Sequence, residues 1–320
     1  MKHVVFALLS TLLSTPSLAA SEAVTLQTTT GTLCGTLELP EGAGPHPVAL
    51  IHPGSGPTDR DGNSASLPGK NDSLKLLAEG LLGEGIATLR IAKRGVGESA
   101  GAAPSETALR FETYVADAVA WLGKLADDER FGDLYMIGHS EGALIGMLSA
   151  ERAPVRAFVS LSGPGENAAD TLRRQLGAQL GGEQLRGAEI VLEKLEAGEM
   201  VAPLPEAVAS IPGIQNLFRK SVQPYLSSWF QYDPAVVVAR LTVPVLLVQG
   251  THDLQVRVED AHLLAEANPE AQLELIGGMN HILKDAPTDP QANLATYSDP
   301  DLPLAAGLVE VVSGFLEQTP

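Results

Sequence analysis

Cysteine is almost absent from this chain, because Cys34 is the only one among 320 residues. A single thiol cannot form an intramolecular disulfide, so the fold must be held by its own packing. The hydrophobic content of 44% is enough for one large core. Cys34 lies in the run GTLCGTLEL, which predicts a strand in which Cys34 is a small buried residue.

Basic residues are also scarce, with 21 Lys and Arg against 39 Asp and Glu and a net charge of −18. An acidic surface repels phosphate backbones, which argues against nucleic acid as a partner. It gives no attraction toward anionic membranes either.

Long apolar runs are missing too. The run VVFALLSTLL near the N-terminus is about half of the roughly 20 residues that a membrane span needs. It follows the basic start MKH and precedes the small residues SLAAS, which is typical of an export signal cleaved near Ala19 or Ala20. We therefore expect residues 1–20 to be a signal peptide and the mature protein to be periplasmic or secreted without a stable membrane anchor.

The sequence contains no HExxH motif and no paired CxxC motif, so no metal or other cofactor is predicted. The loop from Asp59 to Asn63 has the oxygen ligands of a calcium site. However, Gly62 stands at the wrong position for an EF-hand, and Lys70 occupies the place of the bidentate Glu. We predict a hydrogen-bonded loop, with direct substrate contact by Arg60 as the alternative.

Short apolar segments alternate with helix-like stretches along most of the chain, as in PVALIHPG, IATLRIAKRG, DLYMIGHS and VPVLLVQGTHD. Continuous apolar strands of this kind predict an α/β fold with a mostly parallel, twisted sheet flanked by helices. The segments AVTLQTTT and GTLCGTLELP predict an antiparallel pair at the start of that sheet. The whole of 21–320 is expected to form one domain.

One connection is far longer than an ordinary loop, since roughly 70 residues separate SLSGPG from LTVPVLLV. Helical spacing in DTLRRQLGAQL and EIVLEKLEAGE predicts that this insert, at about 166–233, is a helical cap.

The pattern G-x-S-x-G occurs twice, around Ser99 and around Ser140. Ser140 follows the apolar strand LYMI and precedes the helix-like ALIGMLSAERA, which is the context of a nucleophile on a sharp strand-to-helix turn. Ser99 lies in a Gly-rich segment broken by proline, which favours a turn serine without a catalytic role.

A serine nucleophile needs a base and an acid that orients the base. His281 lies in the loop after the final predicted strand, and Asp253 lies at the end of the preceding strand. Ser140, Asp253 and His281 therefore follow the chain order of the α/β-hydrolase catalytic triad. Glu166, at the end of another strand, is the alternative acid.

Four segments occur in the order HPGSGPTDRDGN, KND, KRGVGES and GHSEG. Together they resemble bacterial carboxylesterases with a GSGPxDRDG loop, relatives of the serine aminopeptidase-like α/β-hydrolases. The resemblance implies an oxyanion hole made by the N–H of Ser55, with Gly54 or Gly56 as alternatives, and by the N–H of Glu141. An acidic residue commonly precedes KRG in this family, whereas Ala92 stands here, which puts the corresponding salt bridge in doubt.

These features predict an exported serine hydrolase that cleaves carboxylic esters of small molecules through an acyl-enzyme intermediate. A peptidase or a thioesterase with the same triad is the alternative, and a catalytically silent binding protein is a third. The fold does not separate these activities.

The predicted cap contains apolar residues that either line an acyl pocket or pack among themselves. An enclosed apolar pocket would favour acyl groups of roughly two to six carbons, with Trp229 and Phe230 limiting their length. The candidate lining residues are Leu172, Leu176, Leu180, Leu185, Ile190, Leu192, Leu195 and the aromatic cluster PYLSSWFQY.

Overall fold

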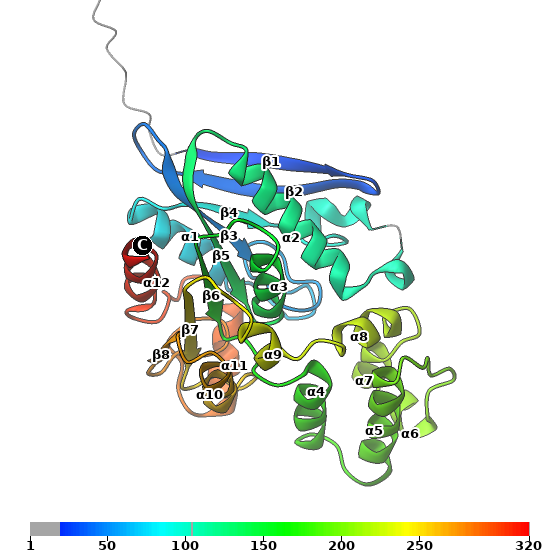
Figure 1. The fold of residues 1–320 in the computed structure, drawn as a ribbon. Helices are drawn as coiled ribbons and strands as arrows, with labels where there is room; N and C mark the ends of the chain where they lie inside the picture. Colours follow the sequence, from blue (N-terminus) through cyan, green and yellow to red (C-terminus); the bar gives the residue numbers. More distant parts are fainter. Residues whose placement is uncertain (1–19, 104, 320) are drawn as a thin grey trace, which may run out of the picture.

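A computed structural model describes residues 20–103 and 105–319. The expected signal peptide falls outside these residues, apart from Ala20. The described chain folds around one eight-stranded sheet in the order β1-β2-β4-β3-β5-β6-β7-β8 (Figure 1). The strands are β1 (Ala20–Thr28), β2 (Gly31–Leu39), β3 (His46–His52), β4 (Ala87–Ile91), β5 (Phe131–His139), β6 (Ala157–Leu161), β7 (Val245–Gly250) and β8 (Gln272–Ile276).

The sheet is parallel except at one edge. β1 pairs antiparallel with β2, and β2 pairs antiparallel with β4, while every later pairing is parallel. The central strands β4, β6 and β7 are buried along their whole length, which explains their continuous apolar runs. The predicted α/β fold and the antiparallel opening pair are confirmed.

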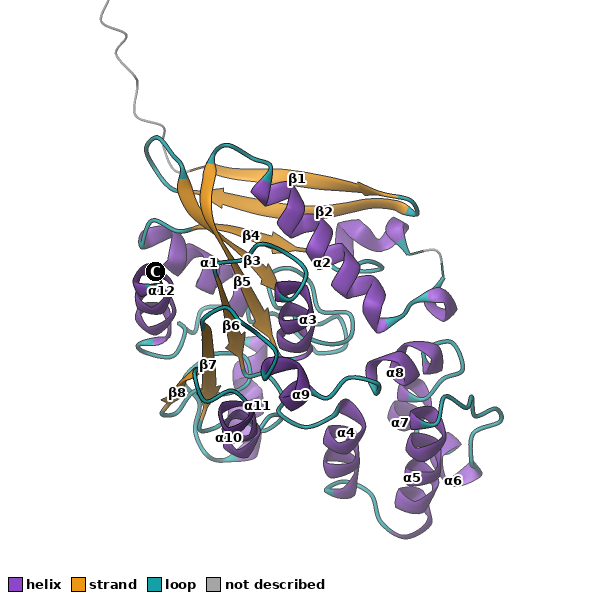
Figure 2. Ribbon diagram, in the orientation of Figure 1, coloured by secondary structure: helices purple, strands orange, loops and turns teal. Residues whose placement is uncertain are grey.

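Helices cover both faces of the sheet (Figure 2). One face packs against α1 (Ser73–Gly83) and α12 (Leu308–Gln318), whose leucines and valines join the apolar side chains of the strands. The opposite face packs against α2 (Phe111–Ala126), α3 (Glu141–Ala150), α9 (Pro234–Val238) and α10 (Val258–Ala267). Short elements complete the body: η1 (Gly97–Ala102), η2 (Glu106–Ala108), α11 (Pro290–Ala295) and η3 (Thr296–Ser298).

Five helices lie in the long connection between β6 and α9 and group together beside the sheet (Figure 1). They pack around their own apolar core, which includes Leu192, Leu195 and Phe218. We call this segment, 166–233, the cap. Its helices are α4 (Ala168–Gly177), α5 (Gly182–Glu196), α6 (Glu206–Ala209), α7 (Pro212–Leu217) and α8 (Gln223–Trp229).

Two local details differ from the sequence-based expectations. Cys34 lies in β2 as predicted but is only half-buried, because it sits near the edge of the sheet, where β2 is flanked by β1. The residue type of Asp72 and its place before SLKLLAEG predict a helix N-cap, but Asp72 precedes α1 in a left-handed conformation and makes no side-chain cap to that helix. Its carboxylate instead accepts a hydrogen bond from Asn63 at 2.6 Å.

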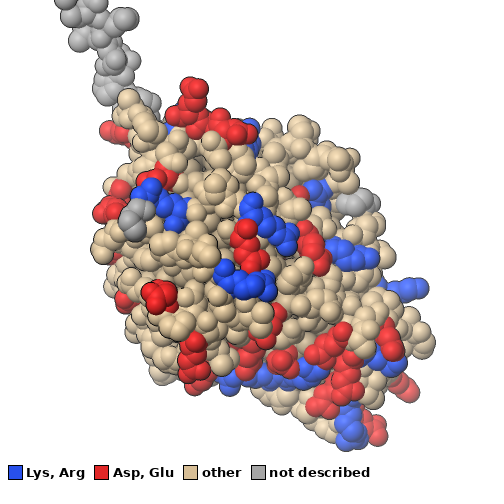
Figure 3. All heavy atoms as spheres, in the orientation of Figure 1, with Lys and Arg blue, Asp and Glu red and all other residues tan. Residues whose placement is uncertain are grey.

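The surface mixes charges of both signs. On the face drawn in Figure 3, Lys and Arg side chains lie among Asp and Glu side chains. Exposed ion pairs include Arg130 with Glu22 and Arg240 with Glu151. Within residues 20–103 and 105–319, no helix combines the length and the apolar character that crossing a membrane requires.

Candidate active site

Ser140 stands on a strained turn between β5 and α3, with φ 56° and ψ −123°. Two glycines make this turn possible. A Cβ on Gly138 would lie 2.1 Å from the carbonyl oxygen of Gly142, and a Cβ on Gly142 would lie 2.5 Å from that of His52. The motif therefore has glycines where two backbone segments approach each other too closely for a Cβ atom. The strained conformation directs the serine side chain away from both the strand and the helix.

His281 and Asp253 reach Ser140 from two loops that follow β8 and β7. Ser140 Oγ lies 3.1 Å from His281 Nε2, and His281 Nδ1 lies 2.8 Å from Asp253 Oδ2. The carboxylate accepts the Nδ1 proton, which leaves Nε2 of a neutral imidazole free to accept the serine proton. The structure thus brings the three predicted residues into one hydrogen-bonded chain.

Asp253 is held by several donors. Its side chain is inaccessible to solvent, and Oδ1 accepts the backbone N–H groups of Gln255 and Val256 at 2.7 and 2.9 Å. Burial by itself would raise the pKa of this carboxyl. The nearby His281 and these hydrogen bonds outweigh burial and keep the pKa below its usual value, so the carboxylate is charged at neutral pH.

The alternative acid, Glu166, and the second G-x-S-x-G serine, Ser99, do not take part in this hydrogen-bonded chain. Glu166 pairs with Arg174 at 3.1 Å and with Arg257 at 3.4 Å rather than with His281. Ser99 is buried in η1, and its Oγ accepts the backbone N–H of Cys34 at 2.9 Å. Ser99 therefore ties η1 to β2, as expected of a structural serine.

Two further histidines lie close to the site and are uncharged. Burial, assisted by Lys93 beside His52 and by His281 beside His139, lowers the pKa of each ring to about 3. The Nε2–H of His139 donates to the carbonyl oxygen of His281 at 2.7 Å, which supports the loop that carries the imidazole.

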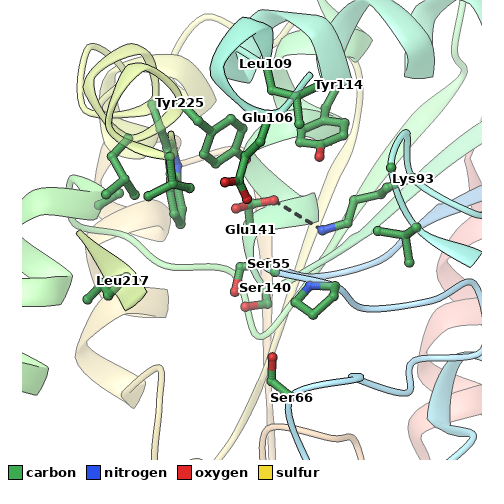
Figure 4. Close-up of a pocket in the computed structure, with 18 of the residues that line it drawn as sticks. Ser55, Ser66, Lys93, Glu106, Leu109, Tyr114, Ser140, Glu141, Leu217 and Tyr225 are labelled. Atoms are coloured by element: carbon green, nitrogen blue, oxygen red, sulfur yellow. Dashed lines mark ion pairs between the residues drawn. The ribbon is translucent and has the colours of Figure 1, made fainter. Parts of the chain in front are cut away.

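The glycine-rich loop after β3 runs beside Ser140. A Cβ on Gly54 would lie 3.1 Å from Ser140 Cβ, so the backbone approaches the serine closely only because residue 54 is glycine. Ser55 and Glu141, whose N–H groups are the predicted oxyanion donors, line the same cavity as Ser140 (Figure 4). Glu141 is the first residue of α3, where helix N–H groups have no partner within the helix.

A buried ion pair beside this loop was not predicted from the sequence. Lys93 Nζ lies 3.6 Å from Glu141 Oε1, and their side chains are only 1% and 2% exposed. Burial lowers the pKa of Lys93, and the charge of Glu141 opposes that shift. The signal for this pair was present in the two motifs KRG and GHSEG, each of which places a charged residue two positions after the end of a strand.

The DRDG segment is a hydrogen-bonded loop, as predicted. Asp59 Oδ1 accepts the N–H groups of Asp61 and Asn63, both at 2.9 Å. Arg60 pairs with Glu98 at 2.6 Å and does not line the cavity, which removes the alternative of direct substrate contact in this conformation. Arg90, on β4, holds the loop through Asp61.

The site opens into a cavity of about 670 Å³ between the body and the cap (Figure 4). The body contributes Ser55, Lys93, Tyr114, Ser140 and Glu141. The cap contributes an apolar and aromatic wall, which consists of Leu172, Leu217, Val222, Tyr225, Leu226 and Trp229.

Several residues that were expected to line the pocket lie in the cap core or on the surface instead. Phe230 is buried in the cap core, as are Leu176, Leu192 and Leu195. Ile190 is 47% exposed. Most of these apolar residues therefore build the cap itself, while Leu172 and Trp229 face the cavity.

Among the residues that the structure describes, no cluster of three or more His, Cys, Asp or Glu side chains is arranged to hold a metal ion. The hydrogen-bonded chain from Ser140 to Asp253 can instead activate a hydroxyl group for attack on a carbonyl.

Comparison with known proteins finds a relative of this chain. Esterase EstD of Thermotoga maritima is 30% identical over 258 residues, which are 78% of this chain and 58% of EstD. This chain thus spans less than two thirds of the length of that relative.

Solved structures share the fold. Est1E from Butyrivibrio proteoclasticus, in a structure with bound ferulic acid, superposes with a TM-score of 0.59 at 20% identity over 93% of this chain and 99% of Est1E. The Pyrococcus furiosus esterase Pf2001 gives a TM-score of 0.56 at 18% identity over 94% of this chain and 91% of that one. Residues 48–295 match the model of the alpha/beta hydrolase family. With its eight-stranded sheet and the Ser140 turn, this chain belongs to the alpha/beta hydrolase family.

Proposed function

We propose that this protein is a serine hydrolase that cleaves carboxylic esters through an acyl-enzyme intermediate. The observation that carries the proposal is the chain of hydrogen bonds from Ser140 through His281 to Asp253, at 3.1 and 2.8 Å, together with the cavity that Ser140 lines. The 30% identity to an esterase over most of this chain supports the same activity.

In the proposed reaction, Ser140 Oγ attacks the ester carbonyl while His281 Nε2 takes its proton. The N–H groups of Ser55 and Glu141 stabilise the negative charge on the carbonyl oxygen, and each donor is worth about 3 kcal/mol in the transition state. His281 then returns the proton to the departing alcohol, which leaves an acyl group on Ser140. A water molecule, deprotonated by His281, hydrolyses this intermediate and restores the serine.

We also propose that short acyl groups are preferred. The apolar and aromatic wall of the cap lines the same cavity of about 670 Å³ as Ser140 and, in this proposal, limits how far a straight chain extends. Each buried CH₂ contributes about 0.8 kcal/mol until that limit is reached, which predicts an optimum at roughly two to six carbons.

The test is a panel of p-nitrophenyl esters of graded acyl length, together with matched thioesters and aminoacyl anilides. The proposal predicts that the highest kcat/KM falls on an ester of short acyl length. Dominant turnover of anilides or thioesters would replace it with a peptidase or a thioesterase, and no turnover of any of them would favour a binding protein.

Export is a separate part of the proposal and rests on the sequence of residues 1–20. We expect the full-length chain, expressed in a bacterium, to accumulate outside the cytoplasm with a new N-terminus next to Ala19 or Ala20. Mass spectrometry of the fractionated protein measures this directly. Recovery of the uncleaved chain from the cytoplasm would contradict export.

A further inference from the structure

Lys93 contacts both segments that carry the proposed oxyanion donors. Its ammonium donates a hydrogen bond to the carbonyl oxygen of Gly54, the residue before Ser55. The same ammonium pairs with the Glu141 carboxylate (Figure 4). One buried cation thus links the loop after β3 to the first residue of α3.

The geometry of a peptide bond gives the first contact a specific consequence. The peptide bond between Gly54 and Ser55 is trans, and in a trans peptide the C=O and the N–H point in opposite directions. Holding the Gly54 carbonyl therefore fixes the direction of the Ser55 N–H. Gly54 lies against Ser140, so with the Ser55 N–H as the proposed oxyanion donor, a rotation of this peptide would turn a carbonyl oxygen toward the reacting group in its place.

The second contact acts on the other donor. The N–H of Glu141 begins α3, and its own side chain turns back to the Lys93 ammonium. Tyr114 adds its ring at 5.5 Å from Lys93 Nζ, which favours the cation. Burying an ion pair gives little net stability, because desolvation offsets the attraction. The placement of this pair is better explained by orientation than by stability.

We infer that Lys93 is a positioning residue that preorganises the oxyanion hole. It acts by holding the Gly54 carbonyl and the Glu141 side chain at once, so that the two N–H groups converge before substrate arrives. This inference rests on the proposed function and adds a role that neither the triad nor the cavity wall supplies. Donors fixed in advance need no reorganisation during the reaction.

The direct test is Lys93→Met, which keeps the length of the side chain and removes the donor. We expect kcat to fall about 10-fold to 100-fold, because removal of one complete oxyanion donor costs about 10²-fold to 10³-fold. KM should change less than twofold. The affinity for a trifluoromethyl ketone, which forms a tetrahedral oxyanion adduct on the serine, should fall by the same factor as kcat.

A matched pair of variants separates orientation from loss of a buried charge. Glu141→Gln and Glu38→Gln make the same chemical change at two buried ion pairs, since Glu38 pairs with Arg90 at 2.8 Å away from the cavity. Only Glu141→Gln should weaken binding of the trifluoromethyl ketone, while both should lower the melting temperature. All values are normalised to active sites counted by complete fluorophosphonate labelling.

The outcomes are distinct. A lower melting temperature with unchanged kcat and trifluoromethyl ketone affinity per labelled site would make Lys93 merely structural and overturn the inference. If Lys93→Met does not fold, the trifluoromethyl ketone affinities of Glu141→Gln and Glu38→Gln are compared instead. Equal affinities of these two variants would overturn the inference. A wild-type protein that hydrolyses no ester and takes no label would overturn the proposed function as well.

Discussion

The body and the cap line one cavity, but their side chains are fixed to different degrees. In the body, the backbone sets the reacting groups: Ser140 sits on a strained turn, and Asp253 is inaccessible and accepts two backbone N–H groups. In the cap, most of the wall comes from short helices, since α7 has six residues and α8 has seven. Such helices depend on packing rather than on their own stability.

Hydrogen bonds, ion pairs and aromatic contacts join the two regions. Ser228 Oγ accepts the N–H of Phe111 at 2.8 Å, Tyr232 donates to Glu112 at 3.0 Å, and the Phe111 and Trp229 rings stack at 5.8 Å. We therefore propose that the body sets the chemistry and that the cap sets which substrates reach it. Changes in the body should therefore affect kcat for every substrate, and changes in the cap should affect the choice between substrates.

The largest expected effect comes from the body. Ser140→Ala and His281→Ala should each lower kcat by about 10⁶-fold, and the double variant should be no slower than either, because the two residues act as one unit. Ser99→Ala is the matched control and should retain turnover, since Ser99 Oγ accepts only a backbone N–H near β2. Additive losses in the double variant would show that the two residues act separately.

Asp253→Asn should lower kcat by about 10⁴-fold, because an amide no longer holds the imidazole in the tautomer that accepts the serine proton. Glu166→Gln should leave kcat unchanged, since Glu166 pairs with Arg174 and Arg257. Steady-state kinetics on one ester compares the two variants. A large loss in Glu166→Gln with little loss in Asp253→Asn would reverse the assignment of the acid.

A pH experiment probes the body alone, because the cap contains no histidine. The pKa of buried His52 is lowered from 6.5 to about 3, so the unfolded chain binds an extra proton between these pH values. The contribution of the neutral His52 ring to the free energy of unfolding is fully present above pH 6.5 and is lost as the pH falls toward 3. At pH 5 about 2 kcal/mol of it is lost.

His52→Asn keeps a donor for the Pro53 carbonyl and removes the titration. Urea unfolding at pH 7 and pH 5 should therefore show a smaller loss of stability on acidification in the variant than in the wild type, by about 2 kcal/mol. Equal losses would show that His52 is not held neutral.

The smallest effect is expected from the cap. Trp229→Leu should move the acyl length with the highest kcat/KM to longer chains. Each additional CH₂ that the enlarged pocket buries should raise kcat/KM about fourfold. Phe230→Leu is the matched control: it shortens the next residue, which is buried in the cap core, and should lower the melting temperature without moving the optimum. The same shift of the preferred acyl length in both variants would show that acyl length depends on the packing of the whole cap and not on the wall residue Trp229.

The body was largely predictable from the sequence because its signals are local. Apolar strands that end in Gly, His, Ser or Asp predicted a parallel sheet, and the glycines around Ser140 marked the turn. Ser140, Asp253 and His281 each follow a strand. Because the carboxyl ends of parallel strands lie at one edge of a sheet, these places were enough to predict that the three residues meet.

The cap was predictable only as a set of helices. Leu172 faces the cavity, whereas Leu176, one turn later on α4, is buried in the cap core. Trp229 and Phe230 are neighbours in sequence and also differ in this way. Which side of a short amphipathic helix meets the cavity depends on how the helices pack on one another, and a helical period does not contain that information. The pairing of Lys93 with Glu141 is likewise a product of tertiary structure, because it joins the ends of two different strands.

The central claim is that Ser140 is an activated nucleophile, and covalent labelling tests it most directly. The purified protein is treated with a fluorophosphonate, digested and mapped by mass spectrometry. The account predicts a single adduct on Ser140, which is lost in Ser140→Ala and retained in Ser99→Ala. An adduct on Ser99, or a native protein that takes no label, would contradict it.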